Sequence, residues 1–163
     1  PIHRRPGHRS GRRSMRERVT FTSKVAIEHR ETLERLLFFN GCQARVARGI
    51  VDVIDRFGPP EIEVDGEWLR VKVSELSSGV QSLFAVETTT GRPLGVAVYM
   101  RADLEHVTVL HVGLSEEYCA GGERESLNLL LRLLKEIRRS SRRVKGVRRM
   151  SVAYGAQRQR AQA

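Results

Sequence analysis

The sequence predicts a single α/β domain with a mixed sheet, two helices near its N-terminus and a crossover helix before its last strand. Three observations support this class. Segments whose apolar residues recur at helical spacing alternate with segments whose apolar residues recur every second residue, as in a strand. The chain has 163 residues, which is the length of one domain with tails. The segments 94–100 and 106–114 are apolar enough for central strands covered on both faces. An amphipathic helix over 127–143 then leads to a final strand at 148–154, as in a crossover between parallel neighbours.

The first third of the domain is predicted to hold one strand and two helices. Residues 16–25 alternate weakly between apolar and polar and indicate a strand. From Ala26 the apolar residues recur at helical spacing, and Asn40-Gly41 is a good C-terminal cap. A second helix is expected from about Gln43 to the Gly-Pro-Pro sequence at 58–60.

The middle of the chain predicts antiparallel strands. Asp65-Gly66 is the strongest hairpin signal and joins two short strands within 61–73. A loop at 74–80, a strand at 83–86 and a turn at 88–93 follow.

Side-chain faces follow from the same periods. In the 127–143 helix the expected apolar stripe comprises Leu127, Leu130, Leu131, Leu134 and Ile137, with Leu133 beside it. In the 106–114 strand, strict alternation places His106, Thr108, Leu110 and Val112 on one face, and Val107, Val109, His111 and Gly113 on the other.

Charge divides the chain into a mildly acidic body with two basic ends. Residues 1–18 hold seven arginines and one glutamate, and residues 132–163 hold eleven basic residues and one glutamate. Residues 19–131 hold 11 basic and 17 acidic residues. We expect a disordered basic arm at 1–15, one domain at 16–154 and a flexible tail at 155–163.

Several classes of protein are disfavoured by composition. No stretch approaches about 18 consecutive apolar residues, so we expect no membrane span. Cys42 and Cys119 are far apart in the sequence, and no histidine or cysteine pair has metal-ligand spacing. We therefore expect reduced thiols, a cytoplasmic location and no metal site.

Three segments carry a family resemblance. FAVETTTGRPLGVAVY at 84–99, VTVLHVGLSEEY at 107–118, and LNLLLRLLKEIRR followed by GVRRMSVAY resemble successive elements of the GNAT N-acetyltransferase family. The resemblance covers roughly residues 16–154. It implies a GNAT-like sheet whose fourth and fifth strands splay apart, acetyl-CoA or another acyl-CoA in the gap, and transfer of the acyl group to an amine.

The resemblance also implies roles for individual residues. Backbone of Val112, Gly113 and Leu114 would pair with pantetheine, and Gly121, Gly122 and Arg124 would lie near the pyrophosphate. A helix N-terminus favours such anions. Glu105 or His106, at the start of the fourth strand, would be the base that takes the amine proton.

The sequence departs from the family pattern in three places, one of which is the hairpin at 61–73, an insertion or an altered first half. Its two loop glycines are adjacent, and Glu123 and Glu125 put negative charge near the expected pyrophosphate, although both also suit the first turn of a helix. The family continues beyond the fifth strand, whereas few residues follow Tyr154 here. A working enzyme and a lineage with altered chemistry both stay open, as does completion of the sheet by a second copy of the chain.

A competing hypothesis rests on the basic residues near the C-terminus. In it the GNAT-like module is not catalytic and acts in an assembly, or on nucleic acid, through Arg138, Arg139, Arg142, Arg143, Lys145, Arg148 and Arg149. That many cations exceed what a helix C-terminus needs. The alternative is that these residues form only a solvated face. Arginine is used in place of lysine nearly everywhere in this chain, so its abundance here can reflect composition rather than function.

Overall fold

The structure, a computed structural model, describes most of the predicted domain. The described residues are 18–38, 47–73, 76, 79–119, 121–122, 128–143 and 146–153. Both predicted arms, at 1–15 and 155–163, lie outside them.

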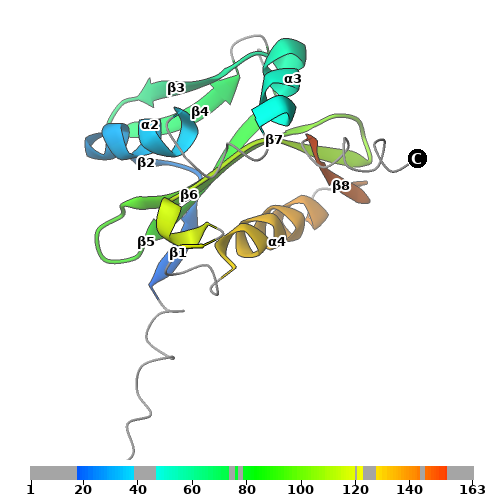
Figure 1. The fold of residues 1–163 in the computed structure, drawn as a ribbon. Helices are drawn as coiled ribbons and strands as arrows, with labels where there is room; N and C mark the ends of the chain where they lie inside the picture. Colours follow the sequence, from blue (N-terminus) through cyan, green and yellow to red (C-terminus); the bar gives the residue numbers. More distant parts are fainter. Residues whose placement is uncertain are drawn as a thin grey trace, which may run out of the picture.

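A five-stranded mixed sheet forms the centre of the fold (Figure 1). Its order is β1-β5-β6-β7-β8. The strands are β1 Val19–Thr22, β5 Val80–Glu87, β6 Pro93–Arg101, β7 His106–Leu114 and β8 Arg149–Val152. Neighbours pair antiparallel except β7 and β8, which pair parallel. The predicted crossover between parallel neighbours is therefore confirmed.

A second sheet of three strands was not expected as a separate unit. It has the order β2-β4-β3, with β2 Val25–Ala26, β3 Pro60–Asp65 and β4 Trp68–Val73. The predicted Asp65-Gly66 hairpin joins β3 to β4, and Gly66 adopts the positive φ of 62° that such a turn requires.

The single strand predicted at 16–25 is wrong, because the chain changes sheets within it. β1 ends at Thr22, and β2 pairs with β4 instead of continuing along β5. The Lys24 ammonium lies 4.6 Å from the centre of the Trp68 ring, a cation–π contact that favours this turn toward β4.

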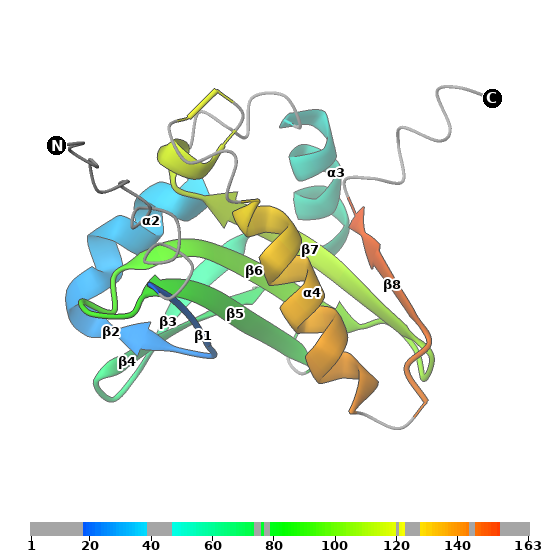
Figure 2. The same cartoon turned by 90° about the horizontal axis from the view of Figure 1, so that it is seen from below.

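Helices cover both faces of the large sheet. They are η1 Ile27–His29, α2 Arg30–Phe38, α3 Ala47–Phe57, η3 Glu116–Tyr118 and α4 Leu129–Arg142. α4 lies against one face, whereas α2, α3 and the small sheet lie on the other (Figure 1). Viewed from below, α4 crosses β5, β6 and β7, with β8 at the edge (Figure 2).

The buried side of α4 differs from the predicted stripe. Leu129, Leu133 and Ile137 are buried at four-residue spacing, whereas Leu130 and Leu131 are 40% and 53% exposed. Leucine occupies nearly every position at the start of this helix, so spacing alone did not select the buried face. The buried face of α4 is therefore determined by the side chains of the sheet on which the helix packs.

Gly113 sets how closely α2 approaches the sheet. A Cβ added at Gly113 would lie 2.3 Å from the carbonyl oxygen of Leu36, which is far inside contact distance. The backbone of α2 therefore packs directly on β7, and no other residue fits at this position.

We predict that Gly113→Ala destabilises the fold by about 3 kcal/mol or more, since backbone atoms must move to admit the methyl group. Gly66→Ala is the matched control. It meets nothing within 4 Å and is strained only by its positive φ, so it should cost about 1 kcal/mol. Urea unfolding followed by circular dichroism measures both variants. Equal destabilisation would contradict the close approach of α2.

Candidate functional site

The parallel pairing of β7 with β8 is short. It begins at His106 opposite Arg149 and ends at Val109 opposite Val152. β8 ends there, but β7 continues through Leu110–Leu114. Among the described residues, β8 thus lies alongside only the first part of β7, and no described strand lies along that edge of the remaining five residues, a position we call the opening.

A β-bulge in β7 coincides with the end of this pairing. Val98 of β6 lies opposite His111, but the next residue, Tyr99, lies opposite Val109, so Leu110 is the extra residue on β7. A bulge bends its strand and interrupts pairing. The bulge therefore bends β7 at the residue after its last pair with β8.

The bulge also corrects the predicted faces of β7. Val107 and Val109 pack on the α4 side, and beyond the bulge Val112 does so too. Leu110 packs in the opposite core, and Gly113 faces α2. One extra residue reverses the alternation that follows it, so the predicted grouping of Val112 with Leu110 is wrong.

His111 is buried at the bulge and is joined to the end of α3. Burial lowers the pKa of His111 to about 4, and a hydrogen bond with the backbone of Gly58 partly opposes that shift. The ring is therefore neutral at pH 7. Only 4% of the residue is exposed, so it supports the packing of α3 on β7 rather than facing the opening.

We predict that this buried histidine makes the fold less stable in mild acid. Above pH 6.5 the ring is neutral in both states, so its burial carries no protonation penalty. As the pH falls toward 4, the unfolded state binds a proton that the folded state excludes, which removes up to about 3 kcal/mol of unfolding free energy.

His111→Gln should lack this component, and His106→Gln, at a more exposed position, should retain it. Urea unfolding at several pH values between 4 and 7 measures the difference. Parallel pH profiles for the wild type and His111→Gln would contradict the prediction.

The glycine loop after β7 closes a tight turn. The N–H of Gly122 donates to the carbonyl of Cys119 at 2.9 Å. A Cβ on Gly122 would lie 2.4 Å from the carbonyl oxygen of Glu116, and Gly121 has a positive φ of 83°. Both glycines are thus needed to turn the chain back over η3, and the amide of Gly122 is already used. Arg124 lies outside the described residues.

The N-terminus of α4 follows this loop. Its cap residue, Asn128, has a left-handed backbone with φ 48° and makes no side-chain capping hydrogen bond. The first N–H groups of any helix have no acceptor within the helix. Together with the helix dipole, the first-turn amides of Leu129–Leu131 favour an anion at this end.

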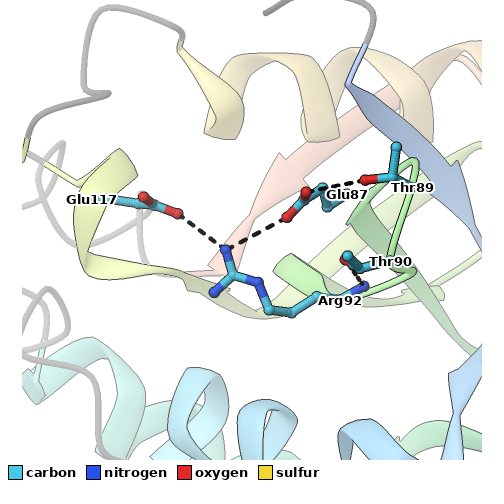
Figure 3. A network of polar contacts seen from close by, with 5 residues as sticks. All are labelled: Glu87, Thr89, Thr90, Arg92 and Glu117. Carbon is cyan, nitrogen blue, oxygen red and sulfur yellow. Dashed lines mark hydrogen bonds and ion pairs between the residues drawn. The ribbon is translucent and has the colours of Figure 1, made fainter.

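An ion-pair network holds η3 against the turn between β5 and β6 (Figure 3). Nη2 of Arg92 lies 3.8 Å from Oε2 of Glu87 and 3.7 Å from Oε1 of Glu117. Thr89 donates to Glu87, and the backbone N–H of Arg92 donates to Thr90. These contacts are partly exposed and individually weak, but they join the start of the glycine loop to the sheet. These ion pairs cannot be predicted from the sequence, because an Arg-Pro turn carries no signal for a distant carboxylate.

Glu105 and His106 lie at the opposite end of β7 from the glycine loop. The carbonyl of Glu105 accepts the N–H groups of Arg148 and Arg149, at 2.8 and 2.9 Å. Nε2 of His106 lies 2.8 Å from Oγ of Ser151 on β8. At the ordinary rise of a strand, His106 is about 13 Å from the bulge. The structure therefore does not bring the two predicted bases to the opening.

The predicted basic residues divide between two faces. Arg138, Arg139 and Arg142 lie on α4 and Arg143 is its C-terminal cap, all exposed. Arg149 alternates with Met150, which packs on the α4 side, so Arg149 points to the other face. Lys145 lies outside the described residues.

Cys119 corrects the prediction of reduced thiols. It is disulfide-bonded. Separation along a chain does not fix separation in a fold, so distance in the sequence did not exclude a disulfide. The predicted cytoplasmic location loses the support that it drew from reduced cysteines. Cys42, the other cysteine of the chain, lies outside the described residues.

Comparisons with known proteins do not assign the chain to a family. No protein-family model, curated protein or solved structure matches the chain. The GNAT resemblance stays a prediction. Within the described ranges, no helix is long and apolar enough to cross a membrane, and no group of three His, Cys, Asp or Glu residues could hold a metal ion.

Proposed function

We propose that this chain is a GNAT-like protein that binds acetyl-CoA or another acyl-CoA between β7 and β8 and transfers the acyl group to an amine. One observation carries the proposal. β8 stops beside Val109, at the bulge, while β7 continues to Leu114. In the described structure no strand lies along this edge of β7 beyond the bulge, and an extended ligand would pair there as an added strand does.

Pantetheine suits this position because it is an extended chain with two amide groups. Amides of that kind pair with the edge of a strand as another strand would. Backbone of Val112–Leu114 would supply the pairing, with the thioester end toward the bulge and the nucleotide end toward η3. The direction follows from the loop, since the anion-favouring helix end comes after β7.

The pyrophosphate would lie at the N-terminus of α4. The amide of Gly122 is committed to the turn, so we assign the phosphate contacts to the first-turn amides of α4 instead. Gly121 and Gly122 then contribute by turning the chain over η3. The absence of a side-chain cap from Asn128 favours an external anion there.

Isothermal titration of the full chain with acetyl-CoA tests binding, and hydrogen exchange locates it. The proposal expects a dissociation constant below about 1 mM, with slower exchange of amides in 110–119 and 128–132. Exchange in the small sheet at 60–73 should not change. No heat at millimolar acetyl-CoA, or protection confined to another region, would overturn the proposal.

A charge at the start of α4 should tune the affinity. Leu130 is 40% exposed in the first turn. Leu130→Glu should weaken acetyl-CoA binding by about tenfold, or about 1.4 kcal/mol, because its carboxylate repels the pyrophosphate. Leu130→Lys is the matched control and should bind equally well or more tightly. Titration calorimetry of both variants decides, and equal affinities would place the pyrophosphate elsewhere.

Transfer needs a group that takes the amine proton, and Glu105 and His106 are the predicted bases. Glu105→Gln and His106→Gln separate that role from binding. If either residue is the base, its variant should lower kcat for primary amines by about 100-fold or more, at unchanged acetyl-CoA affinity. Because His106 lies about 13 Å from the bulge, where the thioester end would lie, we expect both variants instead to stay within about threefold of the wild type. Release of the CoA thiol measures the rate. Variants that both stay within about threefold of the wild type would exclude these residues as bases and leave the binding proposal intact.

A further inference from the structure

The solvent-facing side of α4 carries a row of basic residues. Lys135, Arg138, Arg139 and Arg142 recur at i, i+3, i+4 and i+7, which is the spacing of one helix face. The buried residues Leu129, Leu133 and Ile137 lie on the opposite face. We call these four residues the basic stripe. It spans about 10 Å along the helix axis.

The charge of the basic stripe is largely uncompensated. In the described structure only Arg139 forms an ion pair there, with Glu136 at 2.7 Å. Three exposed arginines elsewhere are paired, since Arg30, Arg35 and Arg70 each lie within 3.3 Å of a carboxylate. A helix C-terminus is stabilised by cations in its last turn, but Lys135 and Arg138 precede that turn. The stripe therefore exceeds what the helix itself requires.

The charge of the rest of the domain is opposite in sign to that of the basic stripe. Residues 19–131 hold 17 acidic and 11 basic residues. A polyanion is therefore repelled by the body and attracted to α4, and this contrast orients its approach.

We infer that the basic stripe of α4 binds the phosphodiester backbone of a double-stranded nucleic acid. Cations spaced along one helix face can contact several phosphates at once, and such contacts position a protein on a duplex without reading its sequence. No aromatic residue occurs in 128–153. Single-strand binding relies on stacking of bases on aromatic rings, so the duplex fits this surface better.

This inference is independent of the proposed function. The acyl-CoA contacts involve the N-terminus of α4, and the basic stripe runs from the middle of the helix to its C-terminal end. The helix has 14 residues, so its ends are about 20 Å apart. Failure of acetyl-CoA binding would leave the stripe proposal standing, and the reverse also holds.

Fluorescence anisotropy of the full chain with labelled 20-base-pair duplexes tests the inference. The stripe variant is Lys135→Gln, Arg138→Gln and Arg142→Gln together. The matched control is Arg18→Gln, Arg48→Gln and Arg56→Gln, which removes the same three charges from exposed positions off the stripe. Both variants keep the basic arms, so those contribute equally. Glutamine has nearly the helix propensity of lysine and arginine, and both variants should fold.

The stripe variant should bind the DNA duplex about 100-fold more weakly than the wild type at 0.1 M salt. Its plot of log affinity against log salt should be shallower by about 2.7, at 0.9 for each lost contact. The control variant should stay within about fivefold of the wild type. An RNA duplex of equal length shows whether the protein prefers DNA or RNA, since both have a phosphodiester backbone. Binding of either duplex supports the inference.

Three results would overturn the inference. The first is equal weakening by the stripe and control variants, which would mean that only net charge matters. The second is tighter binding of a 20-nucleotide single strand than of either duplex. The third is binding to vesicles of anionic lipid that depends on the stripe, together with no measurable binding to duplexes.

Discussion

One extra residue in β7 governs the arrangement of the candidate site. Leu110 is that residue, and the bulge around it lies where β7 stops pairing with β8. It reverses which side chains of β7 face α4, so that Val112 joins Val107 and Val109 on that side. Without the bulge, regular alternation would continue to the end of β7.

A second constraint keeps the bulged strand in place. α2 packs backbone against backbone on Gly113, and His111 is joined to the residue after α3. The far side of β7 is therefore held firmly by two helices, while β8 covers only part of its edge. A rigid strand next to a space is a suitable setting for a bound ligand, because the ligand's partners need not reorganise.

The sequence predicted the order of elements well because each element carries a strong local signal. The Asp65-Gly66 turn, the dense apolar strands and the helix before β8 are examples. It did not predict the bulge, since bulges depend on how two strands pair and not on either strand alone. The buried face of α4 was ambiguous for a similar reason, because Leu130 and Leu133 are the same residue type and only packing tells them apart. For the site, Val112–Leu114 lie on the part of β7 beyond its pairing with β8, and the N–H of Gly122 donates within its own turn, which spacing along the sequence could not indicate.

The brevity of β8 gives the molecule a labile edge. Four residues pair with β7, whereas β6 pairs with seven residues of the same strand. Regions with few hydrogen bonds and contacts open at low free energy, far below that of global unfolding. β8 should therefore fray while the other strands stay assembled. The distance between β7 and β8 then fluctuates, so a ligand that binds beside β7 meets several conformations of this edge rather than one.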